Sequence, residues 1–256
     1  MKYEIQISIV TVCRNPGECL RATIESVANQ SYKNIQYIII DGNSSDGTKE
    51  LVEEYGKNVD VFISEKDNGI YDAMNKGISL ATGELIGIIN AGDTYNSDAV
   101  KQVVDMRVQT TQEEAIFYGG INKVDIDRRV VRVLDPVIKL EGLEKDMVLF
   151  HPSIFIPRIV YNAYGKYSDL FRISGDFDLL RRYYKTGLPF IRIDYNMADM
   201  MEGGVSENFK SIFLLSHESA LIRSDGDKNI KYYINRSYSI LIYILFFLKN
   251  YQKMNS

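Results

Sequence analysis

The chain has 256 residues, of which 45% are apolar and 25% are charged, a balance typical of a globular protein with a substantial core. Its formal net charge of −4 argues against bulk binding to nucleic acid, which usually requires a basic face. No run of about 18 apolar residues occurs, so the sequence predicts no segment that clearly spans a bilayer.

The N-terminus and the cysteines indicate a cytoplasmic protein. The opening residues, MKYEIQISIVTV, are interrupted by Glu4 and Gln6, and no small-residue cleavage site follows, so we interpret them as a first strand rather than a signal peptide. Cys13 and Cys19 are the only cysteines and lack the spacing of a metal site, which indicates reduced thiols.

Strands and helices alternate through the first hundred residues. The predicted strands are continuous apolar runs, as expected for strands covered on both faces, and the predicted helices carry apolar residues at helical spacing. We expect strands at 5–12, 35–40, 59–64 and 85–89, and helices at 18–30, 48–55 and 70–81, with Gly83 placed to end the last helix. Repeated β–α units at this spacing predict an α/β fold with a mostly parallel, doubly wound sheet.

The alternation ends near Ala115. Residues 115–134 indicate strands with a charged hairpin, 173–187 a helix with an acidic first turn, and 189–200 another strand. The segment from Glu207 is predicted to be helical and carries a net charge of +3.

The apolar run 240–248 within this last segment is too short to cross a bilayer. Two interpretations stay open for it. One is peripheral contact with an anionic membrane at the inner face of the plasma membrane, and the other is packing onto the domain or onto a second copy in a homodimer.

Polar residues follow all four early strands. They are TVCRN (11–15), DGNSSDG (41–47), SEKDNG (64–69) and NAGD (90–93). Each loop alone is ordinary turn chemistry, but the carboxyl ends of parallel strands meet at one edge, where ligands bind in open α/β sheets. Four polar loops converging there favour a ligand site.

A sugar nucleotide fits these loops better than the common nucleotide motifs do. No G-x-G-x-x-G follows the first strand, and GNSSDGTK reverses the Lys-Thr order of a phosphate-binding loop. Asp41 can accept hydrogen bonds from a base, and Asp93 can hold a divalent cation, Mg²⁺ or Mn²⁺, that a diphosphate also ligates.

Several segments together resemble the family 2 glycosyltransferases with the GT-A fold. They are SIVTVCRN, SVANQSYKNIQYIIIDGNSSDGT, EKDNGIYDAMNKGISLATGELIGIINAGD and ISGDFDLLRR, in the family's order and spacing over about residues 5 to 205. The similarity is strongest to bacterial enzymes that build capsule, exopolysaccharide or lipopolysaccharide. It implies a Rossmann-like, mostly parallel central sheet flanked by helices, here with a helical C-terminal extension.

The resemblance also implies roles for single residues. Asp41 would bind the nucleobase, Asp67 would contact the nucleotide, and Asp93, the last acid of the D-x-D element, would bind the metal. That element reads Ala91-Gly92-Asp93, so the acid that often contacts the ribose is absent. Ribose contacts would then come from the backbone or from Asn90. We assign Thr11 and Arg14, at the end of the first strand, to the same donor site.

The catalytic base implied by the resemblance is Asp176 in SGDFD, where Gly175 replaces the first acid of the family motif. A carboxylate there would take the proton of an acceptor hydroxyl. Asp178 is the second choice. The alternative is that both acids only favour a helix N-terminus capped by Ser174.

Two further segments are compared with the family. MADMMEGGVS, with Gly203 and Gly204, resembles the loop that closes over the donor. His151, in FHPSIF, is expected to be a structural turn residue, with a place near the acceptor as the alternative, and His217 is expected on a face of the last helical region.

The resemblance implies an inverting glycosyltransferase, of the hexosyltransferase kind. It would move sugar from a nucleotide-diphosphate donor, a UDP-sugar, to a hydroxyl of a glycan or lipid-linked acceptor in cell-envelope polysaccharide biosynthesis. We expect residues 1–205 to form the catalytic domain and 206–256 the extension. Two alternatives remain: a sugar nucleotidyltransferase, for whose first loop CRNPGEC is a poor match, and a non-catalytic sugar-nucleotide-binding protein.

Overall fold

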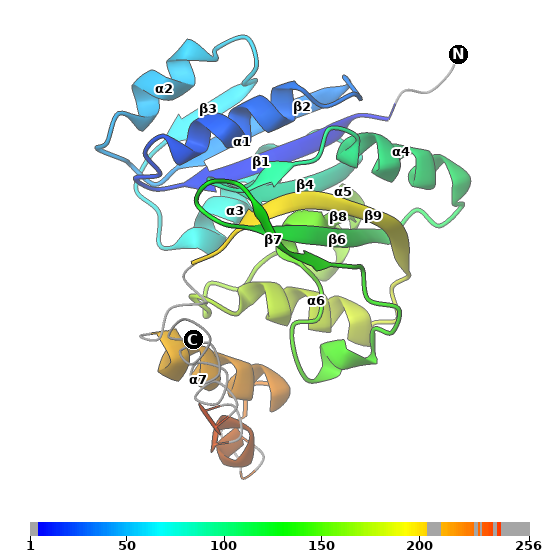
Figure 1. The fold of residues 1–256 in the computed structure, drawn as a ribbon. Helices are drawn as coiled ribbons and strands as arrows, with labels where there is room; N and C mark the ends of the chain where they lie inside the picture. The colour runs from blue at the N-terminus through cyan, green and yellow to red at the C-terminus, as the bar shows by residue number, and fades with distance from the viewer. Residues whose placement is uncertain (1–4, 204–210, 228–229, 231, 238–239, 242–256) are drawn as a thin grey trace.

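The computed structural model describes residues 5–203, 211–227, 230, 232–237 and 240–241. Its centre is a nine-stranded sheet of order β3-β2-β1-β4-β8-β6-β9-β5, with β7 paired to β6 (Figure 1). The strands are β1 (Ile7–Cys13), β2 (Ile35–Asp41), β3 (Val61–Ser64), β4 (Leu85–Asn90), β5 (Thr94–Tyr95), β6 (Ile116–Val124), β7 (Val130–Leu134), β8 (Ile154–Pro157) and β9 (Phe190–Met201). The α-helices are α1 (Cys19–Ala28), α2 (Thr48–Glu54), α3 (Ile70–Leu80), α4 (Ala99–Gln109), α5 (Arg158–Tyr164), α6 (Gly175–Lys185) and α7 (Ile212–Arg223), with 3-10 turns η1 (Glu141–Glu144) and η2 (His151–Ser153).

The first half of the sheet is parallel, as the sequence predicts. β1 pairs in parallel with both β2 and β4, and β2 pairs in parallel with β3. Each connection passes through a helix, which is the geometry that parallel neighbours require. The predicted α/β fold is therefore confirmed.

The second half of the sheet is mixed. β8 lies antiparallel to β4 and to β6, while β9 is parallel to β6 and antiparallel to β5. The chain reaches β8 by way of the β6–β7 hairpin instead of another β–α unit, so the alternation in the sequence ends where the parallel pairing ends.

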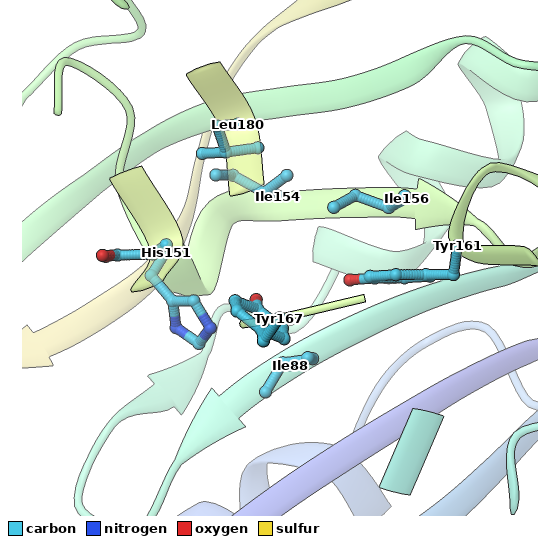
Figure 2. Close-up of a pocket in the computed structure, with 8 residues that line it drawn as sticks. Ile88, His151, Ile154, Ile156, Tyr161, Tyr167 and Leu180 are labelled. Atoms are coloured by element: carbon cyan, nitrogen blue, oxygen red, sulfur yellow. The ribbon is translucent and has the colours of Figure 1, made fainter. Parts of the chain in front are cut away.

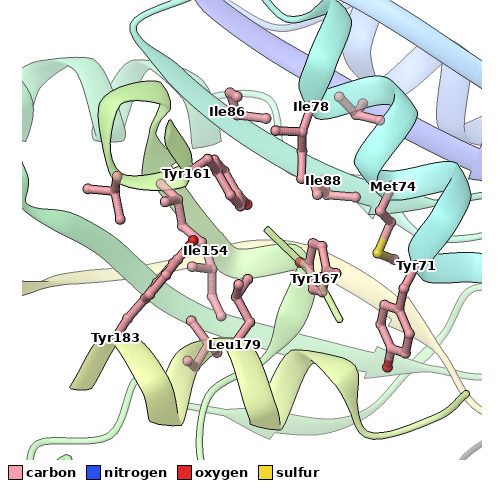
Figure 3. Close-up of a cluster of buried hydrophobic side chains, with 14 of the residues drawn as sticks. Tyr71, Met74, Ile78, Ile86, Ile88, Ile154, Tyr161, Tyr167, Leu179 and Tyr183 are labelled. Atoms are coloured by element: carbon pink, nitrogen blue, oxygen red, sulfur yellow. The ribbon is translucent and has the colours of Figure 1, made fainter. Parts of the chain in front are cut away.

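Helices cover both faces of the sheet, and each face has its own hydrophobic cluster. Successive residues of β1 point to opposite faces, so Val10 and Val12 pack with α3 and α6, whereas Ile7 and Ile9 pack with α1 and α4. Figure 3 shows the first cluster, in which side chains of α3, β4 and α6 meet. Burial on both faces explains why these strands read as continuous apolar runs.

Two local expectations are corrected. Helix α3 ends at Leu80, and Gly83 lies beyond it as a close-contact residue, because an added Cβ there would come 2.5 Å from the Ser8 amide nitrogen. All of MADMM, the first half of the segment compared with a closing loop, belongs to strand β9, which continues to Met201. Gly204 lies outside the described residues.

The C-terminal segment contains α7 and shorter helical stretches. Most of the apolar run 240–248 lies outside the described residues, so both interpretations of that run stay predictions. Among the residues that the structure describes, no helix is both long and apolar enough to cross a membrane.

Candidate active site

The ends of the four parallel strands lie at one edge of the sheet. The strand register places Cys13 beside Asp41, Val12 beside Asn90, and Asp41 beside Ser64. The four polar loops of the sequence therefore begin side by side, as the parallel arrangement requires.

The loops after β1 and β2 are joined by three hydrogen bonds. The Asn15 amide donates to Ser44 Oγ (2.7 Å), the Ser45 amide donates to Asn15 Oδ1 (2.9 Å), and the Gly17 amide donates to Asp46 Oδ2 (2.7 Å). These bonds fix the two loops as one unit at the strand ends.

Asp41 lies at the centre of this unit and is only 1% exposed. Its Oδ2 accepts hydrogen bonds from the Ser44 amide (3.0 Å) and the Ser64 hydroxyl (2.6 Å), and its Oδ1 accepts one from the Ser44 hydroxyl. The Cys13 thiol also donates to Oδ1 (3.7 Å), so the roughly four acceptor positions of the carboxylate are already used. In this structure Asp41 acts on the site through the Ser44 loop that it holds.

Arg14 and Asp67 both lie close to Gly42, the residue directly after Asp41. An added Cβ on Gly42 would collide with the Asp67 carboxylate and would lie 3.4 Å from the Arg14 Cβ. Arg14 is exposed and Asp67 is partly exposed, and the Asp67 Oδ1 accepts a hydrogen bond from the Gly69 amide (3.0 Å). The two predicted donor-site residues therefore lie together at the strand ends.

Thr11 does not fit its predicted role. Its side chain is fully buried within β1, and its hydroxyl is 3.0 Å from the Tyr37 hydroxyl. A side chain enclosed between the sheet and its covering helix is not accessible to a ligand at the strand ends. The residues of TVCRN that are exposed there begin at Arg14.

The turn that carries Asp93 is held by Thr23, a buried residue of α1 that the sequence reasoning missed. The Thr23 hydroxyl accepts a hydrogen bond from the Gly92 amide (2.9 Å) and donates one to the Asp93 carbonyl (2.7 Å). Gly92 has φ +102°, a conformation that favours glycine, and the Asp93 amide donates to the Asn90 carbonyl (3.1 Å). These hydrogen bonds hold the backbone of the turn, and so fix the position of the Asp93 Cα from which the carboxylate extends.

The Asp93 carboxylate is 7% exposed, and its Oδ1 accepts a hydrogen bond from the Met201 amide at the end of β9 (3.0 Å). Beside it, Asn90 Oδ1 is buried and has no hydrogen-bond partner among the described residues. Buried acceptors are rarely left unpaired, so Asn90 fits a hydroxyl donor such as a ribose.

One carboxylate fits a divalent cation that keeps several waters and shares a diphosphate. Within the described residues, no group of three or more His, Cys, Asp or Glu side chains could hold a metal by itself. The donor set therefore fits a cation that binds together with its substrate, and it does not form a complete protein cage.

Asp176 lies in the first turn of α6 and is partly buried. Burial raises the pKa of its carboxyl to about 6, against the opposing effect of the Phe177 amide, which donates to Oδ1 at 2.9 Å. A carboxylate with a pKa near 6 is a stronger proton acceptor than an ordinary aspartate and is still mostly ionised at pH 7. Asp178, the second choice, is bound to Arg182 at 2.9 Å on the same helix.

The start of α6 and the residues before it lie against α3 and the loop after β3. An added Cβ on Gly175 would come 2.6 Å from the Tyr71 ring of α3, and the Tyr71 hydroxyl donates to the Ile173 carbonyl (2.6 Å). The Arg172 guanidinium also donates to the Asn68 carbonyl in the loop after β3. Ser174 occupies the N-cap position as expected, but its hydroxyl makes no capping bond.

Glu218 of α7 holds the segment before Asp176, and the sequence reasoning missed it. Its carboxylate is 3% exposed and accepts hydrogen bonds from three consecutive amides, those of Arg172 (2.8 Å), Ile173 (3.0 Å) and Ser174 (2.8 Å). Nothing in the helical sequence SHESALIR indicates that its glutamate binds a distant backbone segment, because the contact arises only when α7 packs in the folded protein. His217, its neighbour, lies 2.6 Å from the Tyr232 hydroxyl.

More than half of the chain matches a protein-family model. The family model for glycosyl transferase family 2 matches residues 8–156. The chain belongs to glycosyl transferase family 2. The match spans the loops that carry Arg14, Asp41, Asp67, Asn90 and Asp93.

Curated relatives agree with this family. The chain is 26% identical over 175 residues to the PGL/p-HBAD biosynthesis glycosyltransferase of Mycobacterium bovis, covering 67% of this chain and 66% of the relative. It is 24% identical over 191 residues to an uncharacterized glycosyltransferase of Rickettsia typhi, covering 72% of this chain and 60% of the relative. The chain thus spans somewhat less than two thirds of the length of these relatives.

Solved structures share the fold. S. aureus TarS 1–349 in complex with UDP-GlcNAc superposes with a TM-score of 0.67 at 12% identity, covering 94% of this chain and 72% of that one. The mannosyltransferase PcManGT of Pyrobaculum calidifontis, in complex with GDP-Man and Mn²⁺, gives a TM-score of 0.62 at 14% identity, covering 89% and 66%. The predicted GT-A fold is confirmed.

Proposed function

We propose that this protein is an inverting glycosyltransferase that moves a sugar from a nucleotide-diphosphate donor to a hydroxyl acceptor. The observation that carries the proposal is Asp176, a partly buried carboxylate whose pKa is raised to about 6. It lies in the first turn of α6, just after Arg172, which binds the loop after β3 in this family 2 fold. We propose a UDP-sugar as donor, in keeping with the UDP-GlcNAc complex of TarS. The acceptor proposed is a glycan or a lipid-linked glycan of the cell envelope.

The donor would bind across the strand ends. Asn90 Oδ1 would accept a hydrogen bond from the ribose, and the cationic Arg14 would lie close to the phosphates. Asp41 would hold the Ser44 loop against the base, and Asp67 would fix the next loop. Thr11 is left out of this site because its side chain is buried.

A divalent cation, Mg²⁺ or Mn²⁺, would bind to Asp93 together with the diphosphate. When bound, it would neutralise charge on the departing nucleoside diphosphate. The donor set of this chain fits that role, and the neighbour PcManGT was solved with GDP-Man and Mn²⁺. The Thr23 bonds would keep the Asp93 carboxylate in place for this contact.

Asp176 would act as the general base. Its carboxylate would take the proton of the acceptor hydroxyl as that oxygen attacks the sugar, and a direct displacement of this kind inverts the anomeric carbon. Because the base must be ionised, we expect kcat/KM to rise as the pH increases through about 6, the pKa of Asp176. Between pH 7 and pH 5 the ionised fraction, and with it kcat/KM, would fall about tenfold.

We also propose that residues 1–205 form the catalytic domain and that 206–256 form an extension which supports it. The contacts of Glu218 with residues 172–174 favour this arrangement, and so does the buried Arg181, which binds Asp225 at 2.7 Å. A location in the cytoplasm, peripheral to the inner face of the plasma membrane, would suit a lipid-linked acceptor.

The first experiment compares two neutral substitutions. Asp176→Asn should keep donor affinity, measured by calorimetry with a panel of nucleotide sugars, and lose about 10²-fold or more in turnover. Asp178→Asn, which removes the carboxylate that pairs with Arg182, is the matched control and should lose much less turnover. If the two variants exchange these results, Asp178 is the base, and full activity of Asp176→Asn would refute the base role.

The second experiment tests the cation. Asp93→Ala should abolish transfer and weaken binding of the nucleotide diphosphate in Mg²⁺ or Mn²⁺. Full activity of that variant, or of the wild type in excess chelator, would exclude the cation role. Donor binding without any turnover in the wild type, across all acceptors tried, would favour the alternative of a non-catalytic sugar-nucleotide-binding protein.

A further inference from the structure

His151 has an unusual environment for a histidine. It begins η2, the 3-10 turn that leads into β8, and both of its ring nitrogens are buried without a hydrogen-bond partner among the described residues. Burial without a charged partner lowers the pKa of the imidazole to about 4, so the ring is neutral at physiological pH. A neutral imidazole has one N–H donor and one acceptor nitrogen. Buried polar groups almost always have a hydrogen-bond partner, so a buried imidazole with no partner for either nitrogen is unusual.

The same histidine lines a small cavity with the proposed base. The cavity has a volume of about 10 Å³, and its polar lining consists of His151, Tyr161, Tyr167 and Asp176. Isoleucine and leucine side chains complete the wall, and Figure 2 shows them with His151 and the two tyrosines. This volume is near the lower limit for one water molecule, and a buried water needs two to four polar partners. The lining supplies that number.

The groups around Asp176 leave room for a neutral hydrogen-bond donor on the cavity side of its carboxylate. Burial is the main reason for the raised pKa of Asp176, and the negative charge of Glu218 on α7 adds to it, whereas the Phe177 amide and the Tyr71 side chain of α3 lower the pKa. Tyr167 lies on the cavity side. Among the residues that the structure describes, no lysine or arginine lines the cavity. The ionised carboxylate would therefore gain from an N–H group directed towards it.

We infer that His151 is a positioning residue for Asp176. The imidazole N–H of His151 donates a hydrogen bond to one water in the shared cavity, and that water donates to the Asp176 carboxylate. This inference rests on the proposed function of Asp176 as the base. His151 does not accept the proton from Asp176, because it is the weaker base of the two at the pH where Asp176 ionises. Its part is to favour the charged form of the carboxylate and to hold its direction.

Nuclear magnetic resonance of the full chain can test this contact without any turnover. The protein has only two histidines, so labelled imidazole signals can be assigned with His217→Gln. We expect the His151 ring signals to shift with a midpoint near pH 6, the titration of Asp176, while the ring itself stays neutral until about pH 4. Asp176→Asn should abolish the midpoint near 6. A His151 spectrum that does not change between pH 5 and 7 would overturn the inference.

Kinetic variants supply the second test. His151→Leu should move the acidic limb of the kcat/KM profile to a pH higher by about 0.5 to 1 unit, and so lower kcat/KM at pH 5.5 by roughly three- to eightfold. His151→Asn, which keeps an N–H donor, should recover part of the shift. Ile88→Val, which removes one methyl group from the same cavity wall, is the control and should leave the limb in place.

The outcomes separate the inference from the function on which it rests. If Asp176→Asn remains active while the His151 signals of the wild-type protein follow the titration of Asp176, the base assignment fails and the contact stands. If Asp176→Asn is inactive while His151→Leu leaves the limb where it is, the base assignment stands and His151 is only a packing residue.

Discussion

Replacing Glu218 with glutamine should loosen the start of α6 and slow the reaction. The Glu218 Oε2 accepts two of the three backbone hydrogen bonds, from Ile173 and Ser174, and Oε1 accepts the third, from Arg172. In Glu218→Gln the better orientation keeps the oxygen on the pair of amides and turns an NH₂ group towards Arg172. One hydrogen bond is then lost, and the other two lose their charge assistance.

The size of the effect follows from these contacts. Hydrogen bonds to charged groups contribute about 1.5–3 kcal/mol each, so one lost and two weakened bonds would cost about 4 kcal/mol before any compensation. Glu218 is 3% exposed, and the neutral amide no longer bears the desolvation cost of a buried charge, which offsets part of the loss. We expect a net decrease of about 2 kcal/mol in the free energy of unfolding.

Urea unfolding and transfer kinetics measure the two consequences. We expect a lower unfolding midpoint and a kcat reduced by about tenfold or more, because Asp176 begins two residues after the held segment and small displacements of catalytic groups are costly. Donor affinity should change less, since the strand-end loops keep their own hydrogen bonds. The control is Glu113→Gln, the same substitution at an exposed site. A Glu218→Gln protein with the midpoint and kcat of the wild type would refute the argument.

Three further predictions concern the donor site and the tail. Thr23→Val keeps the side-chain shape but removes the hydroxyl that bonds to the Gly92 amide and the Asp93 carbonyl. It should destabilise the protein by about 2–4 kcal/mol in urea unfolding and increase the Mn²⁺ concentration needed for donor binding; unchanged Mn²⁺ dependence would separate Thr23 from the cation site. Asp41→Asn should raise the donor KM by about tenfold through a disordered Ser44 loop, and an unchanged KM would show that the charge is not needed. Deletion of residues 237–256 should release the protein from anionic vesicles in sedimentation and keep donor binding; a truncated protein that unfolds would show instead that the tail is part of the core.

The sequence predicts the strand ends well, for a physical reason. Continuous apolar runs followed by polar turns are what a sheet covered on both faces requires, and parallel pairing places their carboxyl ends together. The position of four residues at the strand ends therefore follows from the sequence pattern alone: Arg14, Asp67, Asn90 and Asp93. Thr11 shows the limit of this reasoning, because the last polar residue of a buried strand can be bonded inside the fold, here to Tyr37.

The residues that hold the acids in place could not be predicted in this way. Thr23 lies in α1 and Glu218 in α7, each far along the chain from the acid that it supports. Their side chains are ordinary for a helix, and only the packing of the helices onto the sheet brings them to the site. The mixed second half of the sheet escaped prediction similarly, because strand direction there depends on tertiary pairing and leaves no periodic signal.

The contact between Tyr71 and Gly175 has a consequence for how members of this family vary. An aromatic ring on α3 fills the space that a side chain at position 175 would need, and the added Cβ would lie 2.6 Å from it. A chain with an acid at position 175 must therefore have a smaller or displaced residue at position 71, so the two positions should vary together. The pair Tyr71→Ala with Gly175→Glu should accordingly fold better than Gly175→Glu alone, and an alignment of relatives should contain either the aromatic–glycine pair or the small–acidic pair.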